Sequence, residues 1–124
     1  MNNLADLAVS EPVRVDTRRM REIVNELGEA AGSELIQIAL EQMALAVGAL
    51  RKAAAAGNGD GVVAQAERLS RLAWQVGLVT LAAVAVDVAD CARRRDPVAL
   101  GATLARVGRV ANGSLSRIWE GLAG

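Results

Sequence analysis

The sequence predicts an all-α protein, an up-and-down antiparallel four-helix bundle with a short additional helix at its N-terminal end. Three observations lead to this prediction. Apolar residues make up 52% of the 124 residues and recur at helical spacing, only two prolines occur, and no stretch alternates apolar and polar residues as a strand would. Phe and Tyr are absent, so a core of Ala, Val and Leu must fill its space with small side chains.

The N-terminal end combines an arm with a short helix. Residues 1–13 show no sustained period, and we expect a flexible arm there, followed by a single domain over 14–124. Asp16 is a good N-cap, apolar residues follow it at helical spacing, and Gly28 closes this helix.

A second, longer helix is expected to begin at Ser33, which can serve as its N-cap. Its packing stripe consists of Ile36, Leu40, Met43, Val47 and Leu50. Leu35 and Ile38 widen this stripe, so we expect the helix to be central and to be contacted on more than one side. It ends in "AAAAGNGDG", where Gly57 supplies a turn and Asp60 can cap the next helix.

The third and fourth helices are separated by Gly77. The third runs from Gly61 to about Val76, and Gly77 ends or bends it. Its stripe consists of Val62, Ala66, Leu69, Ala73 and Val76. The fourth helix keeps the same period through Leu78, Leu81, Ala85, Val88 and Ala92, and stops at "RRRD", where cations suit the helix dipole.

The last helix has the clearest beginning, because Asp96 and Pro97 form an N-cap followed by a first-position proline. Its stripe consists of Leu100, Leu104, Val107, Ala111, Leu115, Ile118 and Leu122. Asn112 and Gly113 are expected to break or kink it, because this dipeptide favours turns.

Composition excludes several classes of function. Fourteen basic residues balance fourteen acidic ones, so we expect no nucleic-acid partner. The longest uncharged run, Leu72–Val86, is shorter than the roughly 20 residues that cross a membrane, so no membrane partner is expected.

The single cysteine, Cys91, suits a small core residue in a reducing cytoplasm. Because the chain has no histidine, we expect neither a metal site nor a cofactor. Arg-rich, Ala-rich composition indicates GC-rich coding and favours a bacterial source.

The stretch "AERLSRLAWQVGLVT" and the order of helices around it resemble the bacterial histidine-containing phosphotransfer (HPt) domains over about Val15–Leu122. The third helix of that family carries His, any residue, Leu, Lys, Gly and Ser, with a further Gly ten residues after the His. In this chain Glu67 stands at the His position, Leu69 at the Leu, Ser70 at the Lys, Arg71 at the Gly, Leu72 at the Ser and Gly77 at the final Gly.

The departures from this pattern determine the expected function. The family's phosphoryl transfer needs an imidazole, and the chain contains no histidine. Arg71 replaces the glycine that leaves room for a receiver domain, and Ser70 replaces the phosphate-favouring lysine. The resemblance therefore implies a degenerate domain that cannot accept phosphate, with no catalytic residues.

Two side chains of this helix each have two open interpretations. Glu67 either forms a solvated pair with Arg71, four residues later, or imitates the charge of a phosphohistidine. Trp74 lies away from the buried stripe, where it either forms a docking surface or covers a neighbouring helix or the N-terminal arm.

From the resemblance we expect a non-catalytic module that binds a receiver domain or a histidine kinase of a two-component pathway. The expected partner-binding residues are Glu67, Ser70, Arg71 and Trp74. The alternative is a structural or self-associating bundle, in which Trp74, Leu78, Leu4 and Leu7 are buried in a homodimer.

Overall fold

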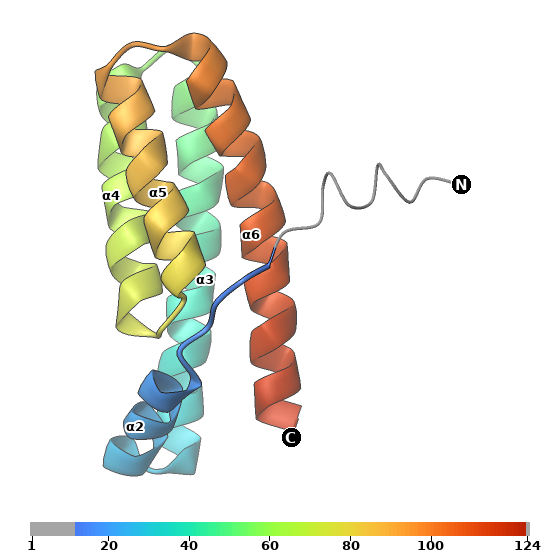
Figure 1. Ribbon diagram of the computed structural model, residues 1–124. Coiled ribbons are helices and arrows are strands. Elements are labelled where there is room, and N and C mark those ends of the chain that lie inside the picture. Colours follow the sequence, from blue (N-terminus) through green and yellow to red (C-terminus); the bar gives the residue numbers. More distant parts are fainter. Residues whose placement is uncertain (1–11, 124) are drawn as a thin grey trace.

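The computed structural model describes residues 12–123, with the backbone alone described for 119–123, and this part of the chain is all-helical (Figure 1). Its helices are α2 (Thr17–Leu27), α3 (Glu29–Ala55), α4 (Gly59–Gln75), α5 (Val79–Arg93) and α6 (Pro97–Ala123). Residues 12–123 contain no strand, so the predicted all-α class is confirmed.

Two of the predicted N-caps are confirmed. The Asp16 side chain accepts hydrogen bonds from the backbone N–H groups of Arg18 and Arg19 at 3.1 and 3.3 Å, and so begins α2. The Asp96 carboxylate accepts a hydrogen bond from the Ala99 N–H at 3.1 Å, and α6 begins at the next residue, Pro97. Both contacts satisfy N–H groups that have no partner within the helix.

Two other predicted N-caps are wrong. Ser33 lies inside α3, because Gly28 at φ 87° turns the chain and the helix resumes at Glu29. Asp60 lies in the first turn of α4, where its charge suits the helix dipole. The N-cap of α4 is Asn58, whose side-chain oxygen accepts from the Gly61 N–H at 2.9 Å.

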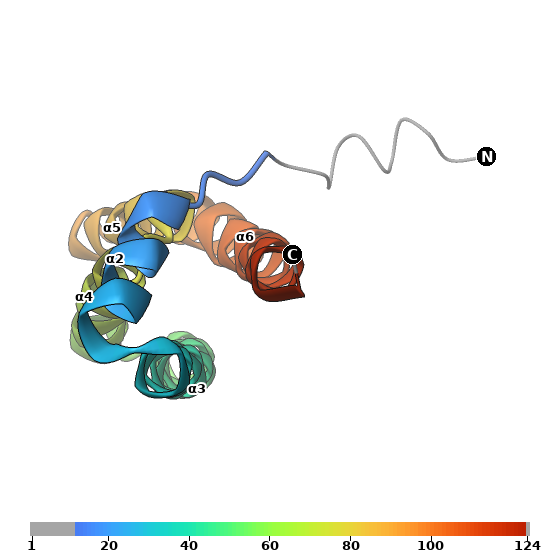
Figure 2. The same ribbon diagram turned by 90° about the horizontal axis from the view of Figure 1, so that it is seen from below.

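The helices α3 to α6 pack in chain order. Tight turns join them, and consecutive helices run in opposite directions (Figure 1). The contact between α4 and α5 is the most extensive, followed by α3 with α4 and α5 with α6. Seen from below, α3 and α6 lie at the two ends of this row (Figure 2). The expectation that the helix beginning near Ser33 is central is therefore wrong, because α4 and α5 occupy the centre.

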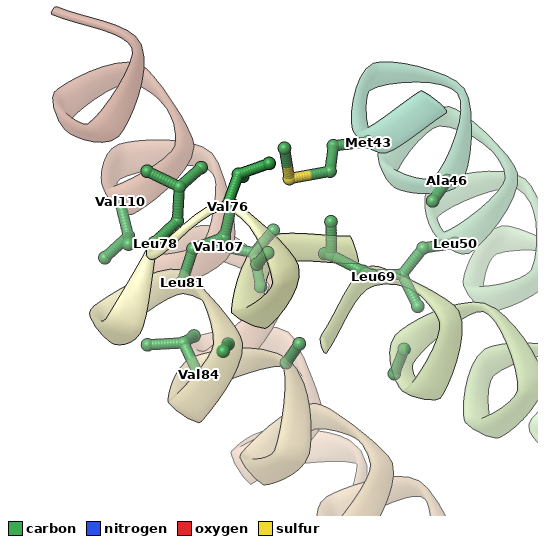
Figure 3. Close-up of a cluster of buried hydrophobic side chains, with 14 of the residues drawn as sticks. Met43, Ala46, Leu50, Leu69, Val76, Leu78, Leu81, Val84, Val107 and Val110 are labelled. Carbon is green, nitrogen blue, oxygen red and sulfur yellow. The ribbon is translucent and has the colours of Figure 1, made fainter. Parts of the chain in front are cut away.

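The core lies between these helices and is built from small and medium side chains (Figure 3). All five stripe residues predicted for α4 are buried. The labelled members of the cluster, none more than 4% exposed, are Met43, Ala46, Leu50, Leu69, Val76, Leu78, Leu81, Val84, Val107 and Val110. Burial of these apolar surfaces is the main contribution to the stability of the fold.

A groove of about 320 Å³ lies between α3 and α6, and Leu78 and Leu81 at the start of α5 form part of its lining. Leu40 and Val47, two residues of the predicted α3 stripe, line this groove and are only partly buried. Leu115 on α6 lines it as well and is 41% exposed. The Ser114 hydroxyl is buried beside the groove without a hydrogen-bond partner among the described residues. The stripes of α3 and α6 are thus only partly covered.

The predicted break at Asn112 and Gly113 is wrong, since α6 continues through both residues. Gly113 instead permits a close approach of the chain segment before α2. A Cβ atom at Gly113 would lie 2.7 Å from a methyl carbon of Val13. Residues 1–11 of the expected flexible arm lie outside the described part of the chain, whereas Val13 packs against the core.

Candidate functional site

The candidate site is the exposed face of α4 at Glu67, Arg71 and Trp74, which we call the α4 face. The three residues follow one another at spacings of four and three, so a helix places them on one side. All three are exposed, and Trp74 is 64% exposed. The structure thus brings together three of the four residues that the sequence singled out.

Glu67 is paired with Arg93 of α5. An Nη atom of Arg93 lies 3.0 Å from a carboxylate oxygen of Glu67, and its other Nη atom lies 3.3 Å from a carboxylate oxygen of Asp90. The interpretation of Glu67 as a partner of Arg71 is wrong, because α5 packs along α4 and its last turn brings Arg93 to Glu67. Arg71 forms no hydrogen bond or ion pair with the described residues.

These ion pairs contribute little to stability. The side chains of Glu67 and Arg93 are each 49% exposed, so solvent screens their attraction. Exposed pairs of this kind contribute between zero and about 1 kcal/mol. Their main effect is to hold the Glu67 carboxylate toward α5 and to offset part of its charge.

Ser70 lies apart from the α4 face. Its hydroxyl donates a hydrogen bond to the Ala82 carbonyl oxygen at 3.1 Å, and the residue is partly buried between α4 and α5. The position that the family uses for a phosphate-favouring lysine therefore joins two helices in this chain.

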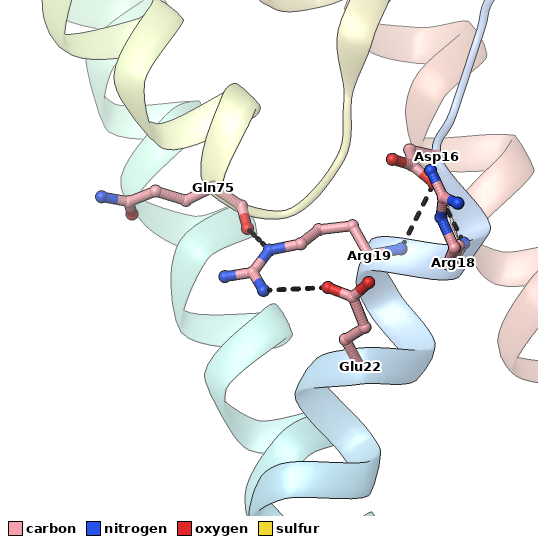
Figure 4. A network of polar contacts seen from close by, with 5 residues as sticks. All are labelled: Asp16, Arg18, Arg19, Glu22 and Gln75. Carbon is pink, nitrogen blue, oxygen red and sulfur yellow. Dashed lines mark hydrogen bonds and ion pairs between the residues drawn. The ribbon is translucent and has the colours of Figure 1, made fainter.

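The C-terminal end of α4, beside Trp74, is held by an arginine that the sequence analysis did not single out (Figure 4). Arg19 of α2 donates a hydrogen bond from Nε to the Gln75 carbonyl oxygen at 3.0 Å, and its Nη1 lies 3.4 Å from a carboxylate oxygen of Glu22. This contact satisfies a carbonyl that the helix end leaves free. No local pattern could have indicated it, because the two residues are 56 positions apart.

Trp74 borders a shallow cavity of about 390 Å³ at this junction. The other residues that line the cavity are Asp16, Arg19, Gln75, Gly77 and Val79. Although the indole lies beside α2, most of its surface stays in contact with solvent. It therefore offers a large apolar surface next to Arg71, whose guanidinium has no partner among the described residues.

A cavity of about 830 Å³ lies at the opposite end of the molecule, between the α3–α4 and α5–α6 turns. Charged residues that line it include Asp60, Arg93, Arg95 and Asp96. Cys91 also borders it but is only 3% exposed, as expected for a small core residue. Among the described residues, no group of three or more Cys, Asp or Glu side chains could hold a metal ion.

The apolar surface expected for self-association requires a correction. Leu78 is 1% exposed and belongs to the core, because the turn at Gly77 directs it inward. Leu4 and Leu7 lie outside the described residues. Of the four residues named for that alternative, Trp74 alone is an exposed residue within residues 12–118.

The α4 face presents a carboxylate, a guanidinium and an indole. Arg and Trp are enriched among the residues that dominate protein–protein binding energies, so these groups suit recognition of another protein by charge and apolar contact. A comparison with family models, with curated proteins and with solved structures found no match.

Proposed function

We propose that this protein is a non-catalytic, HPt-like binding module of the bacterial cytoplasm. It engages a receiver domain or a histidine kinase of a two-component pathway through the α4 face. By occupying the partner's phosphotransfer surface without accepting phosphate, it alters the flow of phosphoryl groups.

The observation that carries this proposal is a tryptophan that is 64% exposed beside an arginine that has no ion pair with the described residues. Exposing an indole to water is energetically unfavourable, so an indole left this exposed favours a role in binding another molecule. Trp74 and Arg71 lie within two turns of Glu67, the position that corresponds to the phosphorylated histidine in the resemblance. The proposed docking surface is therefore centred where the family places its own.

The finer architecture, an up-and-down four-helix bundle preceded by a short helix, is part of this proposal. Its support is the antiparallel packing of α3 to α6 in chain order, with α2 placed before them. The groove between α3 and α6 lies where a closed bundle has its fourth helix–helix contact.

Glu67 has a minor role in the proposed contact. A single carboxylate imitates a phosphohistidine imperfectly, because the phosphoryl group carries nearly two charges. The pairing with Arg93 at 3.0 Å weakens the imitation further. We therefore assign most of the binding energy to Arg71 and Trp74.

The test is a titration of the protein against the receivers and kinases of its own genome. The double variant Arg71→Ala, Trp74→Ala should bind its partner at least about tenfold more weakly, as expected for two central interface residues. A matched double variant on α6, Val98→Ala with Arg117→Ala, removes one exposed apolar and one exposed cationic side chain and should bind normally. Undiminished binding by the α4 variant would reject this face.

A phosphotransfer assay tests the non-catalytic part of the proposal. Radiolabelled phospho-kinase and phospho-receivers should leave the unmodified protein unlabelled, because no imidazole is present. The Glu67→His variant supplies the missing nucleophile at the proposed docking centre and should gain label. Label on the unmodified protein would overturn the proposal.

A further inference from the structure

The helix α3 exposes an unusually large apolar surface. It is long and apolar enough to cross a membrane by length and composition, with a mean hydropathy of 1.2 over its most apolar window, yet only 22% of that window is buried. Its extensive contacts are with α2 and α4, and it lies at one end of the row of helices. Such a surface on a folded domain marks an interaction site.

The exposed apolar residues of α3 form a second stripe beside the buried one. This outer stripe consists of Ala31, Leu35, Ile38 and Leu45. Gln42, between Ile38 and Leu45, is partly buried and accepts a hydrogen bond from Arg68 of α4. The members of the stripe follow one another at spacings of four, three and seven residues, which place them on one side of the helix, as in helices that pack in a coiled coil. Leu35, Ile38 and Leu45 are 44%, 47% and 62% exposed.

The charges beside the outer stripe are divided between the two halves of α3. Glu34 and Glu41 lie in the N-terminal half, and Lys52 lies in the C-terminal half. Arg51 is not one of these charges, because it lies on the other side of α3 and lines the groove toward α6. Glu34, Glu41 and Lys52 are exposed, and none of these three side chains forms a hydrogen bond or ion pair with the described residues. An antiparallel second α3 would bring Glu34 of each copy near Lys52 of the other and would leave Glu41 of one copy near Glu41 of the other at the middle of the contact. A parallel second α3 would place like charges together at all three positions.

We propose that the outer stripe of α3 is the interface of an antiparallel, two-fold symmetric homodimer. With the symmetry axis at the level of positions 41 and 42, Ile38 of one copy faces Leu45 of the other, and Glu34 of one copy approaches Lys52 of the other. The same patch then serves both copies, as a closed two-fold interface requires. The α4 face takes no part in this contact. Evidence against the dimer would therefore leave the proposed signalling contact untouched, and evidence against the signalling contact would leave the dimer untouched.

The first test is sedimentation velocity over a range of concentrations. The unmodified protein should sediment as a dimer at micromolar concentration, and Leu45→Glu should sediment as a monomer with unchanged helical circular dichroism. The matched control is Val98→Glu, which places the same charge at an apolar residue that is 82% exposed on α6 and should leave the dimer intact. A monomeric unmodified protein, or a dimeric Leu45→Glu variant, overturns the proposal.

Charge exchange tests the direction of pairing. Glu34→Lys and Lys52→Glu each create like-charge contacts at both ends of an antiparallel pair, and each should weaken the dimer about three- to tenfold. The double variant Glu34→Lys, Lys52→Glu restores opposite charges in the antiparallel dimer and should recover the original dissociation constant. In a parallel dimer each position faces itself, so like charges meet in the unmodified protein and in every variant. Single variants with an unchanged dissociation constant, or a double variant without recovery, therefore reject the antiparallel arrangement.

Vesicle flotation tests whether a lipid surface, and not a second copy of the protein, covers the outer stripe. With vesicles of phosphatidylcholine and phosphatidylglycerol, the unmodified protein should remain in the unbound fraction, because Glu34 and Glu41 flank the stripe and repel an anionic membrane. Flotation that Leu45→Glu abolishes would assign the stripe to a membrane and overturn the dimer.

Discussion

Gly77 determines how the α4–α5 turn meets the segment before α2. Its φ is 84°, a left-handed conformation that favours glycine, and a Cβ atom there would lie 2.6 Å from the Asp16 carbonyl oxygen. The Gly77 carbonyl oxygen also accepts a hydrogen bond from the Asp16 N–H at 2.7 Å. Both backbone conformation and close packing therefore require glycine at this position.

Replacing Gly77 by alanine should lower the free energy of unfolding more than the same replacement at a glycine that has a positive φ but no close neighbour. Gly57 is the matched control, since its φ is 68° and a Cβ atom there would have no neighbour within 4 Å. We expect Gly57→Ala to lower the free energy of unfolding by about 1–2 kcal/mol through backbone strain alone. Gly77→Ala should cost about 3 kcal/mol or more, because the segment at Asp16 must also move. Urea unfolding measures both, and equal losses would contradict the role assigned to the close approach.

The partner of Glu67 shows what local reasoning at the residue scale misses. An acid followed by a base four residues later stabilises an isolated helix, which is why Arg71 was the expected partner. In the folded chain Arg93 reaches Glu67 from another helix and pairs with it at 3.0 Å. Helical spacing states which residues can meet on one helix, but it contains no information about side chains that a second helix supplies.

At the scale of elements, the contact between α4 and α5 depends on small side chains. Ala66 and Ala73 of α4 and Ala85 and Ala89 of α5 are each at most 1% exposed. Alanine at these positions lets the helices approach closely, as the composition without Phe and Tyr predicts. The two helices with the most extensive contact in the described part of the chain thus both contain fully buried alanines.

A larger side chain in this contact should be destabilising. Ala85→Leu adds three carbon atoms where the residue is fully buried, and we expect a loss of about 1–3 kcal/mol from overpacking. Ala83→Leu is the control on the same helix, because Ala83 is exposed and should accept leucine with a change of at most about 0.5 kcal/mol. Thermal and urea unfolding compare the two variants; similar stabilities would show that the α4–α5 contact contains unfilled space.

At the scale of the whole molecule, the arrangement of helices predicts an uneven distribution of stability. The central helices α4 and α5 are packed on both sides, whereas α2 packs chiefly on the end of α3 that extends beyond α4. Ile23 is the one fully buried residue of α2. Few buried apolar contacts make local opening inexpensive, so α2 should open without unfolding of the bundle.

Native-state hydrogen exchange tests this gradient. Amides in the middle of α4 and α5 should exchange only through global unfolding and should share its free energy and its dependence on denaturant. Amides of α2 should exchange through a local opening of lower free energy that hardly depends on denaturant. Removing the N-cap with Asp16→Ala should lower protection in α2 by about 1 kcal/mol and leave the centre of α4 unchanged. Equal protection in α2 and α4 would instead indicate one cooperative unit.

The sequence by itself determined the helical class, the beginnings of α2 and α6 at Asp16 and Asp96, the chain reversals at Gly28 and Gly77, and the buried stripe of α4. These features depend on hydrogen bonds, backbone angles and periodicity within a few residues of one another. Only the tertiary structure decided that α3 lies at an end of the row, that Glu67 pairs with Arg93, and that Leu78 is buried while Leu45 is exposed. Apolar periodicity shows which side of a helix can be buried, but whether a partner covers that side depends on packing between segments far apart in the chain.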